Sequence, residues 1–428
     1  MTTVELPYGR KRLSVRLPAD CDATVIHKPV TPALSDPARA IEMALDQPAG
    51  EDCLEDHARG CATACVVVCD FTRPVPNRLF LRPIVERLMS AGVPLNGITV
   101  LVATGLHRPN EGDELAEVIG DPWILENVAI ANHRARVDHE HVELGTTGRG
   151  TVVRLDRRFV EADLKLVTGL VEPHLMAGYS GGRKVVAPGI AHAETITTLH
   201  NHRFMADPAA SNCIIAGNPL HEELIEIVAM AGDIVALNTV VDDQRRLSFV
   251  NFGDVLPSHA DAVAFARRHA EVTVPRRFKT VVTSAGGHPL DATYYQTVKA
   301  MVGPLAIVAD GGDVILASAC SEGLGSAAYA AAQTRLCDRG ITGFLADLAT
   351  KDRADIDEWQ TQMQTRAQAR ARIGLYSEGL DADSRAITGV DDVASLEHAI
   401  GESMARHGDP RVAVIPEGPY VIPSVASP

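Results

Sequence analysis

Short apolar runs alternate along the chain with amphipathic stretches. CVVVCD (65–70) and GITVLVATG (97–105) are short and almost uniformly apolar, which is typical of strands buried on both faces. Between them, NRLFLRPIVERLMSAG (77–92) has the spacing of an amphipathic helix that ends at Gly92. Strand, loop, helix and strand in units of this length predict a parallel α/β sheet.

The alternation continues to about residue 272. Further strands are predicted at 128–133, 151–155, 162–174 and 233–242, and helices at 36–45, 192–205, 221–232 and 258–272. Ahead of them, VELPYGRKRLSVRLP (4–18) has the character of a short β structure. No internal repeat interrupts this order, so the region reads as one α/β domain.

A second series of strands and helices begins after residue 278. Strands are predicted at 279–287, 312–320 and 372–377, and helices at 292–303, 323–336, 357–371 and within 390–408. The tail RVAVIPEGPYVIP (411–423) contains one last strand, which we expect to pack back on the first domain.

A chain of 428 residues is too long for one small core. The segment VTVPRRFK (272–279) carries a proline and three basic residues, which indicates a hinge. We therefore expect an N-terminal domain of residues 1–272 plus about 411–428 and a C-terminal domain of residues 276–408, with hinges near 272–278 and 408–411. The predicted fold class is α/β, with two Rossmann-like parallel-sheet domains and an active-site cleft between them.

Composition and charge exclude several classes of protein. Acidic residues outnumber basic ones by 55 to 40, and the net charge of −15 argues against nonspecific nucleic-acid binding. The sequence contains no apolar run of about 18 residues, so no membrane helix is predicted. The N-terminus lacks the apolar core of a secretory signal. The eight cysteines follow no disulfide framework, which is typical of reduced thiols in the cytoplasm. Of these, Cys61, Cys65 and Cys69 are expected to act as small hydrophobes rather than metal ligands.

Polar loops follow four of the predicted strands, at 70–73, 104–107, 172–184 and 286–296. Ligands of open α/β sheets bind where loops leave the carboxyl ends of strands, so these loops predict a binding site. Asp70 and Arg73 suit sugar hydroxyls and a carboxylate or phosphate, although such a pair can also simply tighten a turn. His107 is a candidate acid or base, although a lone histidine is more often structural.

The stretch EPHLMAGYSGGRKVV (172–186) is too polar and glycine-rich to be ordinary core. A phosphate-binding loop of the nucleotide triphosphatases requires Ser or Thr after its Gly-Lys pair, but Val185 follows Lys184 here. Lysine in a glycine-lined turn can instead be a nucleophile or a covalent anchor, because burial lowers the pKa of its ammonium group.

Other polar clusters give weaker signals. On one helix His200 and His202 would face different sides, so at most one serves a site, and HExxH is absent. The segment 139–141 (HEH) has polar neighbours and is expected to be a solvated edge. Gln296 and Lys299 share a helix face that could bind a carboxylate or could simply face solvent.

Five segments occur in order along the chain: DFTRPVP (70–76), ATGLHRP (103–109), EPHLMAGYSGGRKVVAPGI (172–190), TLHNHRFM (198–205) and YYQTVKAM (294–301). The long glycine-rich segment is the most specific of them. Together they resemble the nickel-pincer nucleotide enzymes of the lactate racemase family, and the resemblance spans the chain.

The resemblance implies a cofactor and a role for each motif residue. Lys184 would be joined covalently to the nickel-pincer nucleotide, a Ni(II) pyridinium-3,5-bisthiocarboxylic acid mononucleotide, and His200 would bind its nickel. Two histidines, His107 and His174, would be the paired acid and base. The remaining motif residues would hold the cofactor (Asp70, Thr72, Arg73) or the substrate (Arg73, Tyr295, Gln296, Lys299), and Trp359 also resembles a family position.

The implied reaction is racemisation or epimerisation at C2 of a 2-hydroxy carboxylate, from lactate to a longer acid such as a sugar acid. Removing C2–H as a proton would place a second negative charge beside the carboxylate, whereas hydride transfer through a 2-keto acid avoids that cost. Each enantiomer presents its hydroxyl on a different side, so two bases are needed. The implied partners are the small substrate and cofactor-biosynthesis proteins, with no nucleic acid or membrane, and a homo-oligomer is left open. A metal-dependent hydro-lyase and a non-catalytic carboxylate-binding protein are the alternatives.

Overall fold

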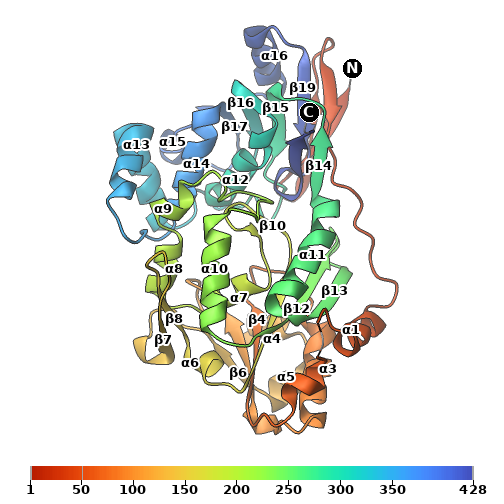
Figure 1. Ribbon diagram of the computed structural model, residues 1–428. Helices are drawn as coiled ribbons and strands as arrows, with labels where there is room; N and C mark the ends of the chain where they lie inside the picture. The colour runs from red at the N-terminus through yellow and green to blue at the C-terminus, as the bar shows by residue number, and fades with distance from the viewer. Residues whose placement is uncertain (1, 51, 427–428) are drawn as a thin grey trace. The chain divides into compact units, whose positions relative to one another are not determined.

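The computed structural model describes residues 2–50 and 52–426 and divides the chain into two compact units. We call residues 30–199 and 209–269 the Lys184 unit, and residues 1–29, 200–208 and 270–428 the His200 unit. Each unit is built around its own six-stranded sheet (Figure 1). The predicted α/β class with two parallel-sheet domains is confirmed. No helix among the described residues is long and apolar enough to cross a bilayer.

The sheet of the Lys184 unit has the strand order β13-β12-β9-β4-β5-β6, and every neighbouring pair is parallel except β12 with β13. Its strands are β4 (Ala64–Cys69), β5 (Ile98–Ala103), β6 (Ala129–Asn132), β9 (Leu164–Leu170), β12 (Val235–Val241) and β13 (Leu247–Asp254). Two small hairpins are formed by β7 (His141–Thr146) with β8 (Val152–Asp156), and by β10 (Pro173–His174) with β11 (Gly178–Tyr179).

Helices cover both faces of this sheet, as its apolar strands require. They are α1 (Pro37–Asp46), α2 (Leu54–Ala58), α3 (Asn77–Ser90), α4 (Gly112–Ile119), α5 (Pro122–Asn127), α6 (Arg157–Val160), α7 (Arg183–Val186), α8 (Ala193–Leu199), α10 (Pro219–Met230) and α11 (Val255–Ala270), with short 3-10 turns at η1 (Leu95–Gly97) and η2 (Asp138–Glu140). Phe80 and Ile84 of α3 are fully buried in one core with Val66 and Val100. Burying such a side chain contributes roughly 1.5–3 kcal/mol.

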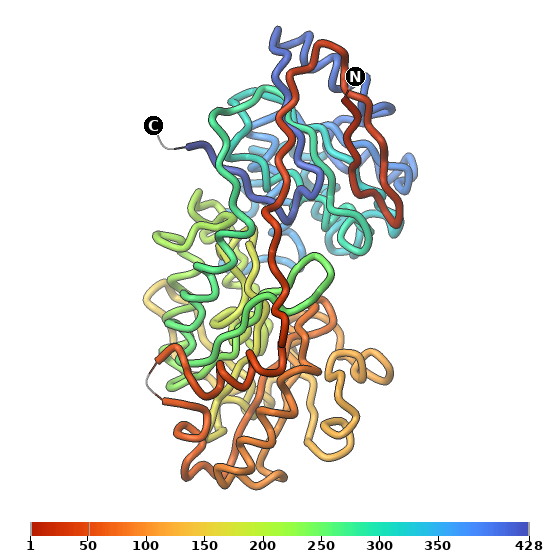
Figure 2. Tube along the Cα trace, turned by 90° about the vertical axis from the view of Figure 1, so that its right-hand side faces the viewer, coloured from red at the N-terminus to blue at the C-terminus, as the bar shows by residue number. Residues whose placement is uncertain are grey.

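The sheet of the His200 unit is parallel throughout, with the order β18-β17-β16-β15-β19-β3. Its strands are β3 (Asp22–Val25), β15 (Phe278–Ser284), β16 (Val308–Ala317), β17 (Ala371–Tyr376), β18 (Asp391–Asp392) and β19 (Arg411–Ile415). The hairpin of β1 (Thr3–Tyr8) and β2 (Lys11–Arg16) is visible in Figure 2, and β14 (Glu271–Val274) pairs with β20 (Ile422–Val425).

One face of this second sheet is covered by the β1–β2 hairpin and α16 (Leu396–His407), whose apolar side chains share a core with β15, β16 and β19. The other helices of the unit are α9 (His202–Met205), α12 (Tyr294–Val302), η3 (Gly303–Ala306), α13 (Ala327–Ala349, interrupted at Gly340), α14 (Glu358–Arg370), α15 (Ala382–Ala386) and η4 (Gly418–Tyr420). Of these, α12 and α14 contact the strands of the sheet, and α13 packs on α14.

The two units divide the chain differently from the expected domains. The sequence pattern predicts that residues 1–29 and 411–428 belong to the N-terminal domain, but β3 and β19 are strands of the second sheet, and β20 pairs with β14. The expectation that the tail packs back on the first domain is therefore wrong. Pairing between strands far apart in sequence decides to which unit the terminal segments belong. The local hydrophobic pattern does not contain that information.

The single helix predicted for 192–205 is also wrong. The structure has α8 and α9 with a break at His200 and Asn201, and the Asn201 side chain caps α9 by accepting the N–H of Phe204. Asparagine is a preferred N-cap because its side-chain oxygen satisfies an unpaired N–H of the first turn. The break assigns Leu199 and His200 to different units.

The segment 139–141 is only partly the solvated edge that was expected. His139 is exposed, but His141 is buried, and its Nε2 lies 3.0 Å from Nε2 of buried His133. The His141 ring also contacts the ring of His192, with 5.0 Å between the centroids. These three histidines form a cluster that polar neighbours in the sequence could not indicate.

Acid should destabilise the protein through this cluster. Burial lowers the pKa of His133 to about 3, whereas an unfolded histidine has a pKa of about 6.5. The unfolded state therefore binds the extra proton first, so the unfolding free energy falls as pH drops below about 6.5. Urea unfolding at intervals from about pH 7 to 5 should show this loss, and His133→Asn should make the pH dependence shallower by about one proton.

His139→Asn is the matched control, because His139 is an exposed neighbour. It should leave the slope of unfolding free energy against pH unchanged. Parallel curves for the wild-type protein and His133→Asn would contradict the prediction.

Candidate active site

Asp70 and His107 follow two adjacent parallel strands of the Lys184 unit. The ends of β4 and β5 are in register at Cys69 and Ala103, so the two loops leave the same edge of the sheet. His107 Nδ1 lies 2.6 Å from Asp70 Oδ2. The structure therefore joins two residues that the sequence analysis selected separately.

The second oxygen of the Asp70 carboxylate, Oδ1, is fixed by hydrogen bonds from Thr72. Oδ1 accepts the Thr72 backbone N–H at 3.2 Å and the Thr72 hydroxyl at 2.6 Å. The Asp70 side chain is 5% exposed and that of His107 57% exposed, so a buried acid orients an accessible imidazole. With Nδ1–H donating to Asp70, the lone pair of Nε2 is available to take a proton.

Arg73 forms an ion pair with Glu172, which follows β9. Both side chains are about one-third exposed (29% and 32%), and the Arg73 backbone N–H donates to Asp70 O at 3.1 Å. The pair links the loops after β4 and β9, which are neighbours in the sheet. The sequence alone indicates no role for Glu172. Its position two residues before His174 was the one feature that could have pointed to the site.

His174 is bonded in a different way from His107. Its Nδ1 accepts two backbone N–H groups, from Met176 at 3.3 Å and Ala177 at 3.1 Å. An acceptor at Nδ1 places the proton of the neutral ring on Nε2. The two histidines therefore present opposite tautomers, one with an Nε2 lone pair and the other with an Nε2–H donor.

The turn before Lys184 is packed closely against α11. Gly182 has φ 47°, and a Cβ at this position would lie 2.9 Å from the Cβ of His259. Glycine is required here on both grounds, because side chains disfavour this φ and there is no room for one. The turn leads into α7, whose second residue is half-buried Lys184.

Arg183 is completely buried beside Lys184. It donates to the carbonyls of Ala177 (3.0 Å) and Tyr179 (3.3 Å), and its Nη1 lies 2.8 Å from Nε2 of His259. Among the described residues no carboxylate pairs with it, and its Nε has no hydrogen-bond partner. Burial consequently lowers the pKa of Arg183 to about 9.

Lys184 lies within electrostatic range of the end of β4. Burial raises the pKa of the Cys69 thiol to about 11, against the opposing positive charges of Arg73 and Lys184. Asp70 and Arg73 follow this strand end directly, and the charge of Lys184 also acts on the Cys69 thiol. Cys69 itself is partly buried, and its thiol lies 3.7 Å from Thr168 O.

His200 belongs to the other unit and contacts Trp359 of α14, with 4.6 Å between the ring centroids. Its segment is anchored by its neighbours. Asn201 donates to Asp352 O at 2.8 Å, and Gln362 donates to His202 Nδ1 at 2.9 Å. His202, for which the sequence indicated no role, therefore helps to hold the segment that carries His200.

Tyr295, Gln296 and Lys299 lie on α12 of the same unit, and all three are half-buried. The Tyr295 hydroxyl accepts from Trp359 Nε1 at 3.3 Å, and burial raises the Tyr295 pKa above its ordinary range, so the phenol stays neutral. Gln296 Oε1 is buried with no hydrogen-bond partner among the described residues. The fully solvated face considered for Gln296 and Lys299 is therefore excluded.

Known proteins resemble the whole chain. Models of the lactate racemase N-terminal and C-terminal domains match residues 8–212 and 275–423. A lactate racemase of Thermoanaerobacterium thermosaccharolyticum is 28% identical over 437 residues, covering 99% of both chains. One of Lactiplantibacillus plantarum is 29% identical over 431 residues, covering 99% of this chain and 100% of the relative.

Solved structures give the same result for the fold. The lactate racemase apoprotein of Thermoanaerobacterium thermosaccharolyticum matches with a TM-score of 0.91 and 27% identity over 100% of each chain. A Thermotoga maritima protein, with a TM-score of 0.65 and 14% identity, covers 93% of this chain and 100% of its own. At that identity the second structure supports the fold alone.

Replacing Gly182 by alanine should test the packing of the lysine turn. The added Cβ would meet His259 in a backbone conformation that alanine disfavours, so we expect a loss of roughly 2–4 kcal/mol in unfolding free energy. Gly217→Ala is the control, because Gly217 also has a positive φ (72°) but open space around its Cβ, and about 1 kcal/mol is expected there. Equal losses in denaturant unfolding would show that the turn is not packed as described.

Proposed function

The chain belongs to the lactate racemase family, and from this premise we propose that it interconverts the configurations at C2 of a 2-hydroxy carboxylate. The observation that carries the proposal is the hydrogen bond of 2.6 Å between Asp70 and His107. Asp70 directly follows β4, whose last residue, Cys69, is influenced by the positive charge of Lys184. An imidazole oriented by a buried carboxylate is suited to taking a hydroxyl proton.

We propose the nickel-pincer nucleotide as cofactor, because residues of both units fit it. The Lys184 amine projects from a rigidly packed turn and is suited to a covalent link. Imidazole is a good nickel ligand, and the ring of His200 is supported by Trp359. When bound, the cofactor would supply a reversible acceptor for the hydrogen that leaves C2 with its electron pair.

The proposed proton transfers fall to His107 and His174. Deprotonating the substrate hydroxyl at Nε2 of His107 makes an imidazolium that Asp70 stabilises through Nδ1. His174, with its Nδ1 occupied by backbone donors, presents Nε2–H as a hydrogen-bond donor to the keto oxygen. To give that proton away it would first take a proton at Nδ1 and release the two backbone N–H groups, so that loss of the Nε2 proton leaves a neutral ring. One histidine would serve each face of the substrate, and the pair would exchange roles in the reverse direction.

Cationic and amide side chains are proposed to bind the substrate carboxylate. Arg73 is accessible but already paired with Glu172, so an incoming carboxylate would share or displace that partner. On the His200 unit, the buried Oε1 of Gln296 lacks a partner among the described residues and is suited to accept a substrate hydroxyl. Lys299 follows one helical turn later and adds a positive charge.

The alternative of a metal-dependent hydro-lyase has less support. It would need a metal ion held by side chains, and in residues 2–50 and 52–426 no three His, Cys, Asp or Glu side chains are placed to hold one. A non-catalytic carboxylate-binding protein would not need the oriented pair of Asp70 and His107. The acid itself, between lactate and longer hydroxy acids, is left to experiment.

Protein made together with the cofactor-making enzymes should invert C2 of at least one acid in a panel of 2-hydroxy acids. Polarimetry or NMR would follow inversion, and intact mass should show an increment that Lys184→Ala abolishes. Lys165→Ala, on β9 of the same unit, should keep both the increment and the activity. Inversion by protein that is unmodified at Lys184 would refute the covalent link, and no inversion by loaded protein would refute the racemase assignment.

Asp70→Asn should lower kcat by roughly 10²–10⁴-fold, because the amide no longer stabilises the imidazolium of His107. KM should change little, since Asp70 is not proposed to bind the carboxylate of the substrate. Asp46→Asn removes a carboxylate from an exposed ion pair with Arg87 and should leave kcat unchanged. A rise in KM at constant kcat would assign Asp70 to binding instead of proton transfer.

A further inference from the structure

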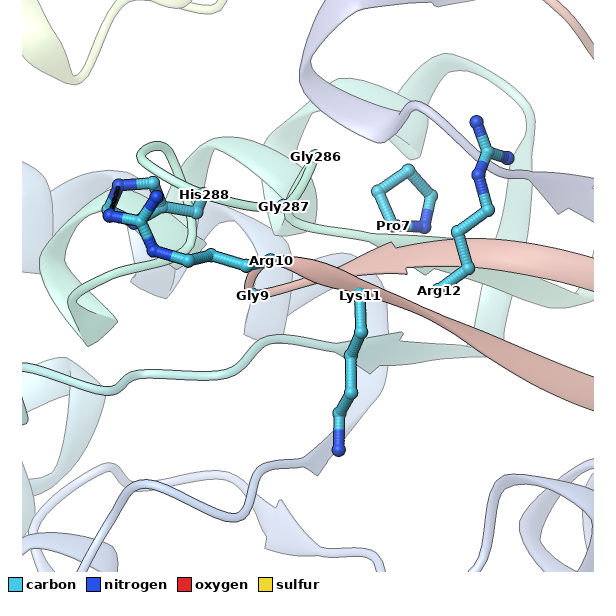
Figure 3. Close-up of a pocket in the computed structure, with 8 residues that line it drawn as sticks. All are labelled: Pro7, Gly9, Arg10, Lys11, Arg12, Gly286, Gly287 and His288. Carbon is cyan, nitrogen blue, oxygen red and sulfur yellow. Dashed lines mark hydrogen bonds between the residues drawn. The ribbon is translucent and has the colours of Figure 1, made fainter.

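A shallow cavity of about 520 Å³, widely open to solvent, lies in the His200 unit between the tip of the β1–β2 hairpin and the turn that follows β15 (Figure 3). It is lined by Pro7, Gly9, Arg10, Lys11, Arg12, Gly286, Gly287 and His288. The turn belongs to a polar loop at the carboxyl end of a parallel strand, where α/β sheets bind ligands. None of the proposed catalytic residues lines this cavity.

The two walls of the cavity are held together by close packing. Gly287 has φ 74°, and a Cβ on it would lie 3.1 Å from the Cβ of Pro7. The backbone N–H of His288 donates to Gly9 O at 2.8 Å, and the N–H of Gly9 donates to the buried carboxylate of Asp291 at 2.6 Å. The hairpin tip is thus fixed on the turn.

The cavity is rich in positive charge, although the chain carries a net charge of −15. Arg10 Nη2 lies 2.9 Å from His288 Nε2, a contact in which the guanidinium donates to a neutral imidazole. Lys11 has an acidic partner, Glu378, at 3.4 Å. In the described part of the chain, neither Arg10 nor Arg12 forms an ion pair with a carboxylate, although both are exposed.

We propose that this cavity binds an oxyanion, either a phosphate or a carboxylate group, through the guanidinium group of Arg12 at one end or that of Arg10 at the other. Guanidinium carries planar, paired N–H donors, and these match the acceptor oxygens of either anion better than other side chains do. In Figure 3, Arg12 extends beside Pro7, while Arg10 extends toward His288 on the other side of the Gly286–Gly287 turn. A bound anion would pair with the charge of Arg12 or Arg10, which in an ordinary exposed hairpin is only hydrated.

Occupancy of the cavity would also restrain the start of α12. From Gly287 the loop continues through Asp291, which accepts a second backbone N–H, from Ala319 at 3.2 Å. It then reaches Thr293, whose side chain caps α12. The oxyanion site therefore lies on the loop that positions Gln296 and Lys299, but its existence does not depend on the racemase proposal.

Calorimetric titration of the cofactor-free, full-length protein would test the site. Inorganic phosphate represents a free phosphate group, succinate a carboxylate without the 2-hydroxy group of the proposed substrate, and chloride holds the ionic strength constant. We expect saturable binding of at least one probe, weakened on the order of tenfold in the double variant Arg10→Gln/Arg12→Gln. Phosphate binding identifies a phosphate group as the ligand, and succinate binding without phosphate binding identifies a carboxylate.

Arg16→Gln is the matched control, since Arg16 is exposed on the same strand β2 and does not line the cavity. It should bind the probe as the wild-type protein does. Lack of saturable binding by both probes, unchanged binding in the double variant, or an equal loss in Arg16→Gln would overturn the proposal. The measurement reads binding without the cofactor, so its failure would leave the racemase proposal untouched.

Discussion

The buried guanidinium of Arg183 is the interaction on which the lysine turn depends. A charge with no carboxylate partner is costly to bury, and here two backbone carbonyls accept N–H groups of the guanidinium, while its Nη1 lies 2.8 Å from Nε2 of His259. Lysine could not reach these groups together, because its single ammonium lacks the spread of donors that guanidinium has. Gly182 packs against His259 with no space for a side chain. The burial of Arg183 therefore also fixes the backbone from which the next residue, Lys184, extends.

His107 and His174, the two histidines proposed to transfer protons, are chemically unequal. His107 is oriented by a carboxylate at Nδ1, whereas His174 is oriented by backbone N–H groups at the same atom. A carboxylate stabilises the charged ring, and a backbone donor at Nδ1 favours the neutral ring with its proton on Nε2. One ring is thus arranged to accept a proton at Nε2, and the other to donate a hydrogen bond from Nε2–H.

The His200 segment depends on an unusual helix. The sequence of α14 is polar, yet most of its side chains are buried. Its glutamines are bonded to specific partners, among them Gln360 to Tyr295 O at 2.9 Å and Gln362 to His202 at 2.9 Å. Buried polar groups bonded to specific partners favour one arrangement more strictly than apolar packing does, so the bonds of Gln360 and Gln362 help α14 to orient Trp359 and Tyr295 together.

The alternation of apolar runs and amphipathic stretches was enough to determine the α/β class and to locate the loops that carry Asp70, His107 and Lys184, because period and strand ends are local properties. Only the tertiary structure brought Asp70 to His107, through the pairing of β4 with β5, and moved residues 1–29 and 411–428 to the second sheet. It also buried His141 and broke the predicted helix at His200. Strand partners and the burial of polar side chains depend on contacts between residues distant in sequence, and hydrophobic periodicity does not contain them.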